Sequence, residues 1–365
     1  MKNLPINENI AALQPYVPGK PISELMREFG LSDIVKLASN ENPLGVSPKA
    51  KIAMQMAIET VNFYPDGNSF ELKQALADFY QLSSDQLVLG NGSNDVLDVI
   101  ARTFLSPEKE VIFSQYAFAV YPIVTQLVGA TAVEVPAQAW GHDLDAMLGA
   151  ITDKTAVIFI ANPNNPTGTL LEKDTVEAFL QQVPAHIVVV LDEAYAEYLE
   201  HLPNYPRGVD YLAQYPNLIV TRTFSKIYGL AGLRIGYGMA SSEIINVLNR
   251  ARQPFNVNLV AQAAAEAALK DSDYVQHSVK TNTEGLEQLA QGLDGLDIEY
   301  IESYANFITF KAPKASELYL KLLEASVIVR PLAGYKMADY LRVSVGDYEQ
   351  NRRFLLALIE NLDAE

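Results

Sequence analysis

The chain has 365 residues, of which 49% are hydrophobic, and it contains no cysteine. Its formal net charge of -17, from 44 acidic and 27 basic residues, disfavours nucleic acid and anionic membranes as partners. The lack of cysteine excludes disulfides and thiolate chemistry, and four scattered histidines predict no metal site. No apolar run is long enough to span a membrane, and residues 1–9 lack the apolar core of a signal peptide. We therefore expect a cytoplasmic protein with one large domain and a smaller one.

The N-terminal stretch is rich in proline. Three prolines within residues 15–21 forbid a helix and predict an extended arm, which lies either on another surface or loosely in solvent. Residues 36–45 are predicted to form a short strand that runs into an Asn-, Pro- and Gly-rich turn. A helix is predicted over 50–61, and Tyr64 lies in the loop that follows, where it can anchor the turn.

A glycine turn joins a predicted strand at 86–90 to an amphipathic helix at 96–104. Backbone N–H groups in such a turn point at the start of the helix, so Gly92, Ser93 and Asn94 form a candidate anion site. The alternative is a plain helix cap by Ser93 or Asn94. The glycine fingerprints of nucleotide-binding proteins are absent from this turn.

Aromatic residues follow the next predicted strand, at 111–113. A flat side chain after a strand end can stack on the flat ring of a ligand. Phe118 is our first choice for that role and Tyr116 our second, with core packing as the alternative for each.

Two further predicted strands, at 156–161 and 187–191, are apolar throughout, as in a parallel sheet covered on both faces. The first leads into a turn in which two prolines hold Asn165 as a rigid amide donor. The second ends at Asp192, whose buried carboxylate needs a cation or donors, and a protonated ring nitrogen of a ligand would satisfy it. Tyr195 can point its hydroxyl to the same side; the alternative for Asp192 is a structural turn.

The strand predicted at 218–220 is followed by Thr223, Ser225 and Lys226, and a glycine-rich return brings Arg234 to the next strand, at 235–239. Ligands bind outside the carboxyl ends of strands in open α/β sheets. Two hydroxyls and a guanidinium suit a phosphate ester, and a primary amine suits a carbonyl. These groups suggest pyridoxal phosphate, whereas a solvated lysine is the alternative.

The C-terminal part is predicted to form a smaller α+β domain. Two arginines, Arg330 and Arg342, lie in its apolar strands, where an unpaired guanidinium is costly; surface salt bridges are the alternative. We predict a large domain at 46–255, and an arm with a small domain at 1–45 and 256–365. The predicted helices are 244–251, 259–269, 286–293, 316–325 and 348–362, and the strands are 297–301, 307–310, 327–330 and 340–344.

Four motifs together resemble one known family. Thr-Phe-Ser-Lys at 223–226, Gly-Leu-Arg-Ile-Gly at 232–236, Asn-Pro-Asn-Asn-Pro-Thr-Gly at 162–168 and Leu-Asp-Glu-Ala-Tyr at 191–195 are similar to those of fold-type I, aspartate-aminotransferase-like enzymes. Within that family the chain most resembles the histidinol-phosphate aminotransferases, from about Pro15 to the C-terminus. The resemblance implies an α/β fold with a mostly parallel seven-stranded sheet between helices, a smaller α+β domain, and a homodimer with shared active sites.

The resemblance also implies roles around pyridoxal 5'-phosphate. Lys226 would bond the cofactor aldehyde and move protons, and Asp192 would hold the ring nitrogen, with Phe118 stacked on the ring. Asn165 and Tyr195 would bind the ring oxygen. The phosphate would be held by Gly92, Ser93, Asn94, Thr223, Ser225, Arg234 and, across a dimer interface, Tyr64.

The expected reaction is amino transfer between histidinol phosphate and 2-oxoglutarate, with glutamate as the second amino compound, in histidine biosynthesis. Tyr16 and Asn42 are expected near the substrate. Arg342 would bind the donor carboxylate, and Arg330 a second anion, either the phosphate of histidinol phosphate or the distal carboxylate of glutamate. An aromatic amino-acid aminotransferase, an amino-acid-phosphate decarboxylase and a non-catalytic cofactor-binding module remain as alternatives.

Overall fold

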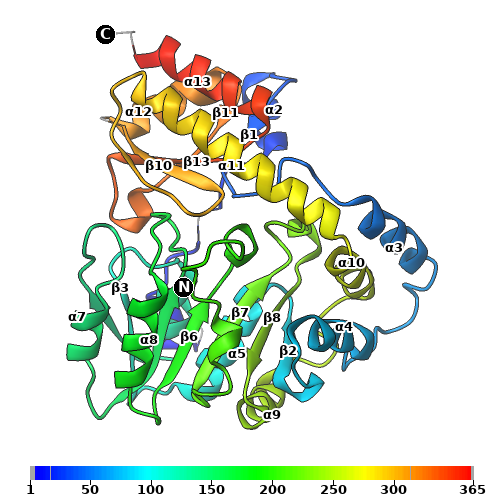
Figure 1. Ribbon diagram of the computed structural model, residues 1–365. Helices are drawn as coiled ribbons and strands as arrows, with labels where there is room; N and C mark the ends of the chain where they lie inside the picture. Colours follow the sequence, from blue (N-terminus) through cyan, green and yellow to red (C-terminus); the bar gives the residue numbers. More distant parts are fainter. Residues whose placement is uncertain (1–4, 17, 313, 363–365) are drawn as a thin grey trace.

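The computed structural model describes residues 5–16, 18–312 and 314–362, arranged in a larger and a smaller unit (Figure 1). The larger unit is built on a seven-stranded sheet of order β2-β8-β7-β6-β5-β3-β4. Strand β8 is antiparallel to both neighbours and the other pairs are parallel, which confirms the predicted mostly parallel sheet. The strands are β2 Leu87–Gly90, β3 Glu110–Ser114, β4 Thr131–Val135, β5 Thr155–Ala161, β6 Val188–Asp192, β7 Leu218–Thr223 and β8 Gly236–Ala240.

Two hydrophobic cores cover the two faces of this sheet. Side chains alternate along a strand, so Ile158 and Ile160 of β5 join one core while Val157 and Phe159 join the other. Helices α4, α7, α8 and α10 contribute to the first core, and α5, α6 and α9 to the second. The helices of this unit are α3 Pro48–Ile58, α4 Phe70–Tyr80, α5 Ser93–Phe104, α6 Val120–Leu127, α7 Leu144–Gly149, α8 Lys173–Gln182, α9 Ser242–Ala251 and α10 Leu259–Leu269.

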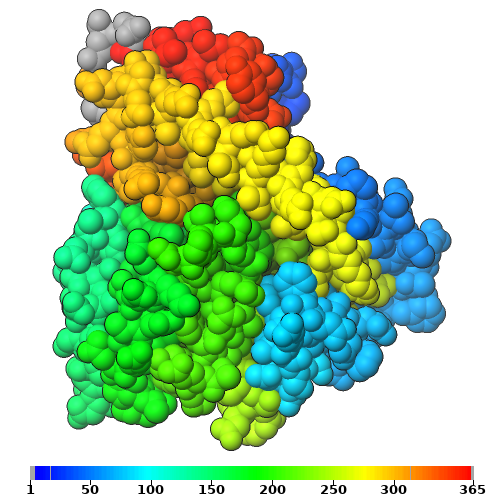
Figure 2. All heavy atoms as spheres, in the orientation of Figure 1, coloured from blue at the N-terminus to red at the C-terminus, as the bar shows by residue number. Residues whose placement is uncertain are grey.

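The smaller unit contains an antiparallel sheet of order β12-β13-β10-β9 and a parallel pair formed by β1 and β11. Helix α11 runs from this unit down over the larger one, in yellow in Figure 2. The elements are α2 Ile22–Phe29, β1 Val35–Lys36, α11 Ser272–Asp294, β9 Tyr300–Ile301, β10 Phe307–Lys311, α12 Ala315–Glu324, β11 Val327–Ile328, β12 Arg330–Pro331, β13 Tyr340–Ser344 and α13 Tyr348–Leu362.

Several predicted element boundaries were wrong; for example, the helix predicted over 50–61 is α3, which ends at Ile58. The helix predicted over 286–293 is the end of α11, whose earlier buried positions are Ser278, Asn282 and Gly285, so the hydrophobic spacing is weak there. The strand at 297–301 shortens to β9 because Asp297 has a positive φ of 55°. The strand at 327–330 divides into β11 and β12, which pair with different partners. Helix α5 begins three residues earlier than predicted, directly after Gly92.

The N-terminal arm contacts its own chain, and the predicted boundary between the two units lies close to α10. Residues 12–16 and 18–21 form no helix, as predicted, and Tyr16 contacts Arg330 of its own chain. A short helix, α1 Glu8–Ala11, packs near α6. Helix α10 packs on α3 and α4, on the side of the larger unit, and the boundary at residue 255 stays a prediction.

Within the described residues, no helix is long and apolar enough to cross a membrane, and no group of three His, Asp or Glu side chains is placed to hold a metal.

Candidate active site

A cavity of about 380 Å³ lies where the carboxyl ends of β5, β6 and β7 face the smaller unit. This is the place where an open α/β sheet binds its ligands. The strands end side by side, so motifs far apart in the sequence meet here. Thirteen of the sixteen residues singled out from the sequence line this cavity: Tyr16, Ser93, Asn94, Phe118, Asn165, Asp192, Tyr195, Thr223, Ser225, Lys226, Arg234, Arg330 and Arg342.

Lys226 brings a partly buried amine into the cavity. Its Nζ donates a hydrogen bond to the backbone oxygen of Ser39, 3.1 Å away, and lies 5.8 Å from the centre of the Tyr195 ring. Burial, together with the positive charges of Arg342 and Arg234, lowers the pKa of Lys226 from 10.5 to about 7. A large share of this lysine is therefore neutral near neutral pH, the form that can attack a carbonyl.

Asp192 provides a carboxylate at the end of β6 with only 4% of its surface exposed. The Tyr121 hydroxyl donates to Oδ2 at 2.8 Å, whereas Oδ1 is buried without a hydrogen-bond partner among the described residues. Burial raises the pKa of Asp192, although the hydrogen bond from Tyr121 and the charge of Lys226 oppose the shift. An acceptor oxygen of this kind suits a charged N–H donor, such as a protonated pyridine nitrogen.

An anion cradle lies at the N-terminus of α5. Thr223 Oγ1 donates to Ser225 Oγ at 2.9 Å, and Arg234 Nη1 lies 3.4 Å from the same Ser225 oxygen. Gly92 caps the helix with φ 88° and ψ 162°, and a Cβ at this position would collide with the Arg234 guanidinium. The cradle therefore combines helix N–H groups, two hydroxyls and a guanidinium, the donor set that suits a phosphate.

Asn165 and Tyr195 lie in the wall of the same cavity. Asn165 Oδ1 accepts a hydrogen bond from Arg342 Nη1 at 2.5 Å, so its amide nitrogen is the group that would donate to a ligand. Tyr195 accepts from Asn40 Nδ2 at 2.9 Å, which leaves its phenol hydrogen for an acceptor. Burial raises the pKa of Tyr195 to about 12, so this phenol is a donor at neutral pH.

The structure separates the two aromatic candidates. Phe118 lines the cavity, whereas Tyr116 packs on Trp140 with ring centroids 5.3 Å apart and lies outside it. Phe118 meets Tyr121 edge to face at 5.9 Å, and Tyr121 in turn stacks on Phe159 at 4.6 Å. Of the two rings, Phe118 is the one placed to stack on a bound ring.

Two arginines from adjacent strands line the cavity. Arg330 of β12 and Arg342 of β13 are paired in register across the smaller sheet. The Arg342 guanidinium lies 5.0 Å from the Phe307 ring centre, and its Nη2 donates to the backbone oxygen of Ala38 at 3.1 Å. Arg330 Nη2 lies 3.4 Å from the hydroxyl of Tyr16, with the guanidinium 5.5 Å from that ring centre. Two guanidiniums facing one cavity suit two anionic groups.

Three predicted residues lie outside the cavity. Gly92 acts through the shape of the cradle described above. Asn42 is buried and donates to Ile227 O at 2.7 Å and Ser278 Oγ at 2.9 Å, so its amide fixes the loop instead of facing the cavity. Tyr64 is 82% exposed and stacks on Phe255 at 4.9 Å, on the surface of this chain.

Other residues of the site were missed by sequence reasoning. Asn40, which has a positive φ of 54°, is the asparagine of residues 36–45 that reaches the site. The preference of asparagine for such backbone angles was an available signal. Glu41 lines the cavity and accepts from Lys36 at 2.6 Å. Tyr121 is 71 residues away from Asp192, and no local pattern marks that contact.

Comparison with known proteins decides the family. The model of the class I and II aminotransferases matches residues 32–358. The chain belongs to this family. Histidinol-phosphate aminotransferase of Methylobacillus flagellatus is 56% identical over 353 residues, covering 96% of this chain and 95% of the relative. Histidinol-phosphate aminotransferase 2 of Pseudomonas aeruginosa PAO1 is 55% identical over 352 residues, with the same two shares.

This class I and II aminotransferase also has solved structural relatives. The crystal structure of histidinol-phosphate aminotransferase from Sinorhizobium meliloti, in complex with pyridoxal-5'-phosphate, has a TM-score of 0.90 and 27% identity, and the match covers 98% of this chain and 97% of that chain. The resemblance drawn from the four motifs is thereby confirmed. The donor set of this aminotransferase fits pyridoxal phosphate, because it offers an amine, an unsatisfied buried carboxylate oxygen and an anion cradle in one cavity.

Proposed function

We propose that this chain transfers an amino group between histidinol phosphate and 2-oxoglutarate, as a step of histidine biosynthesis, with pyridoxal phosphate as its cofactor. The observation that carries the substrate assignment is the register pairing of Arg330 with Arg342, which points two guanidiniums into the cavity that also contains Lys226. The names of the relatives at 55–56% identity agree with this assignment.

The cofactor would be held at four points. Asp192 Oδ1 would accept from the ring nitrogen, which Asp192 keeps protonated. Phe118 would cover one ring face, and Asn165 and Tyr195 would donate to the ring oxygen. Ser225, Arg234 and their neighbours in the anion cradle would hold the phosphate. Bound pyridoxal phosphate supplies the aldehyde that bonds an amine and the ring that takes up electrons.

Lys226 is placed to act twice. Its neutral amine would bond the cofactor aldehyde and, once the substrate amine has displaced it, would remain beside the substrate carbon. A pKa of about 7 suits a group that must take up a proton from that carbon and release it again near neutral pH.

Arg342 and Arg330 divide the anionic groups between them. Glutamate brings an α-carboxylate, which we assign to the buried Arg342, and a distal carboxylate, which we assign to Arg330. Histidinol phosphate has no α-carboxylate, and its phosphate would be bound by Arg330. Tyr16 contacts Arg330 and so would orient that guanidinium and cover the substrate.

We also propose that the active unit is a homodimer in which Tyr64 contacts the phosphate held by the partner subunit. Exposed apolar side chains on and after α3 support this proposal, with exposures of 58% for Ile52, 71% for Met56 and 69% for Phe63. Helix α3 forms the outer edge of the molecule, in blue at the right of Figure 2. A second copy that covers this face would bury those side chains together with Tyr64.

Steady-state assays across amino donors test the proposed reaction. With 2-oxoglutarate as acceptor, we expect the highest kcat/KM with histidinol phosphate, a much lower value with phenylalanine, and glutamate as the product formed from 2-oxoglutarate. A preference for phenylalanine would identify an aromatic aminotransferase. Release of carbon dioxide without glutamate would identify a decarboxylase.

A further inference from the structure

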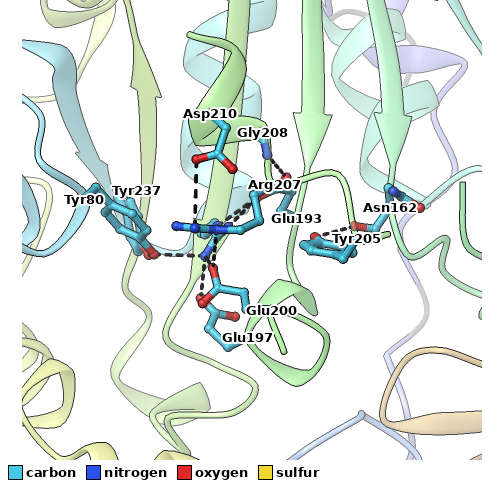
Figure 3. A network of polar contacts seen from close by, with 11 residues as sticks. Tyr80, Asn162, Glu193, Glu197, Glu200, Tyr205, Arg207, Gly208, Asp210 and Tyr237 are labelled. Carbon is cyan, nitrogen blue, oxygen red and sulfur yellow. Dashed lines mark hydrogen bonds and ion pairs between the residues drawn. The ribbon is translucent and has the colours of Figure 1, made fainter. Parts of the chain in front are cut away.

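A buried charge cluster lies behind the active site, and the reaction described above does not use it (Figure 3). At its centre is Arg222 of β7, which has no exposed surface. Its Nε and Nη2 donate to Glu193 Oε2 at 2.9 and 2.7 Å, and Glu193 is 1% exposed. Nη1 donates to Glu200 at 2.6 Å and to the Tyr80 hydroxyl at 3.0 Å.

The two central residues are neighbours of site residues on adjacent parallel strands. Glu193 directly follows Asp192, and Arg222 directly precedes Thr223. Successive side chains point to opposite faces of a sheet, so Asp192 and Thr223 face the cavity while Glu193 and Arg222 meet behind it. The backbone continues the pairing, because Glu193 N donates to Thr221 O at 2.8 Å.

Glu193 also holds the loop beyond β6. Its Oε1 accepts from Gly208 N at 2.6 Å, and a Cβ at Gly208 would lie 2.8 Å from the same oxygen. Both carboxylate oxygens of Glu193 are therefore engaged, one by Arg222 and one by the backbone. Glu197 adds a third carboxyl 3.6 Å from Arg222, and burial raises its pKa to about 8, so it is mostly protonated at neutral pH.

Stability alone is a poor explanation for such a cluster. A buried ion pair seldom stabilises a fold more than well-packed apolar side chains of the same volume would, because both charges lose their hydration. A fixed geometry is what an arginine fork adds, because its donors meet a carboxylate only in a narrow range of positions.

We propose that the Glu193–Arg222 pair is a positioning clamp that fixes the carboxyl ends of β6 and β7 relative to each other, and so sets Asp192 against the Thr223–Lys226 segment across the bound cofactor. The inference rests on the proposed cofactor site. A slip between the two strand ends would move the carboxylate for the ring nitrogen relative to the groups for the phosphate and the aldehyde.

Glu193→Gln in the holoenzyme tests the clamp, with Glu200→Gln as a matched control. Glutamine has a single acceptor oxygen, so either Gly208 N or Arg222 loses its partner. Glu200 also bonds Arg222, but its side chain is 26% exposed and is not adjacent to a cofactor-binding residue. The readouts are the pH midpoint of the absorbance of lysine-bound cofactor, the cofactor dissociation constant, kcat, KM for glutamate, and Tm.

For Glu193→Gln we expect a shifted absorbance midpoint, weaker cofactor binding and a kcat reduced on the order of 100-fold, the effect of about 1 Å of misplacement, with KM for glutamate unchanged. Glu200→Gln should keep the wild-type midpoint and cofactor affinity. A Glu193→Gln enzyme that shows only a lower Tm, with wild-type midpoint and affinity, would overturn the proposal.

If Glu193→Gln does not fold, Arg222→Lys decides by the same readouts, because lysine keeps the charge but lacks the fork. A shifted midpoint in that variant supports the clamp, and wild-type values overturn it. If the wild-type protein itself binds no pyridoxal phosphate, the proposed function fails, which is distinguishable from failure of the clamp.

Discussion

At the scale of single residues, the charge state of Lys226 would control when the site can bond pyridoxal phosphate. The pKa of this amine is lowered from 10.5 to about 7, chiefly by burial and then by Arg342. Its neutral form is the nucleophile, so the rate at which apoprotein bonds pyridoxal phosphate should rise as pH increases through about 7. Stopped-flow absorbance after mixing apoprotein with cofactor gives the midpoint.

Two variants test whether Lys226 is the group that sets this midpoint. Arg342→Met removes the positive charge that most lowers the Lys226 pKa, so the midpoint should move upward, towards the usual lysine value. Lys226→Ala should bond no cofactor at any pH, and borohydride reduction followed by peptide mapping should label Lys226 in the wild type. A wild-type midpoint near 10.5 would contradict the account.

At the scale of elements, the turn between β2 and α5 holds the anion cradle in shape. Gly92 has backbone angles that only glycine adopts readily, and a side chain there would also push on Arg234. Gly92→Ala should therefore lower the free energy of unfolding by about 1–3 kcal/mol and weaken binding of pyridoxal phosphate. Urea unfolding and cofactor titration measure the two effects.

Gly149→Ala is the control for that variant, because Gly149 ends α7 with nothing within 4 Å of an added Cβ and without a positive φ. Alanine there should leave both cofactor affinity and unfolding close to wild type, or raise stability slightly. Equal loss of affinity in the two variants would show that the turn has no special part in phosphate binding.

Elements also explain what sequence reasoning could and could not supply. Asn165, Asp192 and Lys226 follow apolar strands, and parallel strands end at one edge, so their meeting in one cavity could be predicted. The contact of Tyr121 with Asp192 depends on where α6 packs, which no local pattern specifies. Asn42 was expected near the substrate, but Asn40 is the asparagine that lines the cavity, because the direction of each side chain in that turn depends on the backbone angles.

The smaller unit was harder to predict for a related reason. Val329 separates two short strands that belong to different sheets, and apolar composition alone does not show where one strand changes partners. The buried stripe of α11 contains polar and small residues at 278, 282 and 285, so its first half lacks the expected periodicity. Tertiary packing decides both features.

At the scale of the whole molecule, the arrangement of charge and of apolar surface points to function. A chain with net charge -17 gathers Lys226, Arg234, Arg330 and Arg342 around one cavity, so local placement, and not overall charge, would attract an anionic ligand. The exposed apolar face around α3 bears on assembly. A second subunit that covers this face would receive Tyr64 at its own phosphate site.

Subunit mixing tests the shared site. Lys226→Ala is expected to be inactive and Tyr64→Phe weakly active as pure dimers, since the phenylalanine ring lacks the hydroxyl that would donate to the phosphate. A hybrid of the two variants contains one site with both residues intact, so mixed protein should gain activity. Absence of any gain, after mass spectrometry has verified subunit exchange, would contradict sharing of Tyr64 between subunits.

The central claim is that Arg330 binds the phosphate of histidinol phosphate, and kinetics of Arg330→Ala with two donors tests it most directly. Each charge-assisted hydrogen bond contributes about 1.5–3 kcal/mol, so loss of a bidentate contact should lower kcat/KM for histidinol phosphate by roughly two to four powers of ten. Phenylalanine has no phosphate, and its kcat/KM should change far less. Arg342→Ala should instead impair phenylalanine and glutamate, which carry an α-carboxylate, more than histidinol phosphate. If Arg330→Ala slows phenylalanine as much as histidinol phosphate, the phosphate role of Arg330 is wrong.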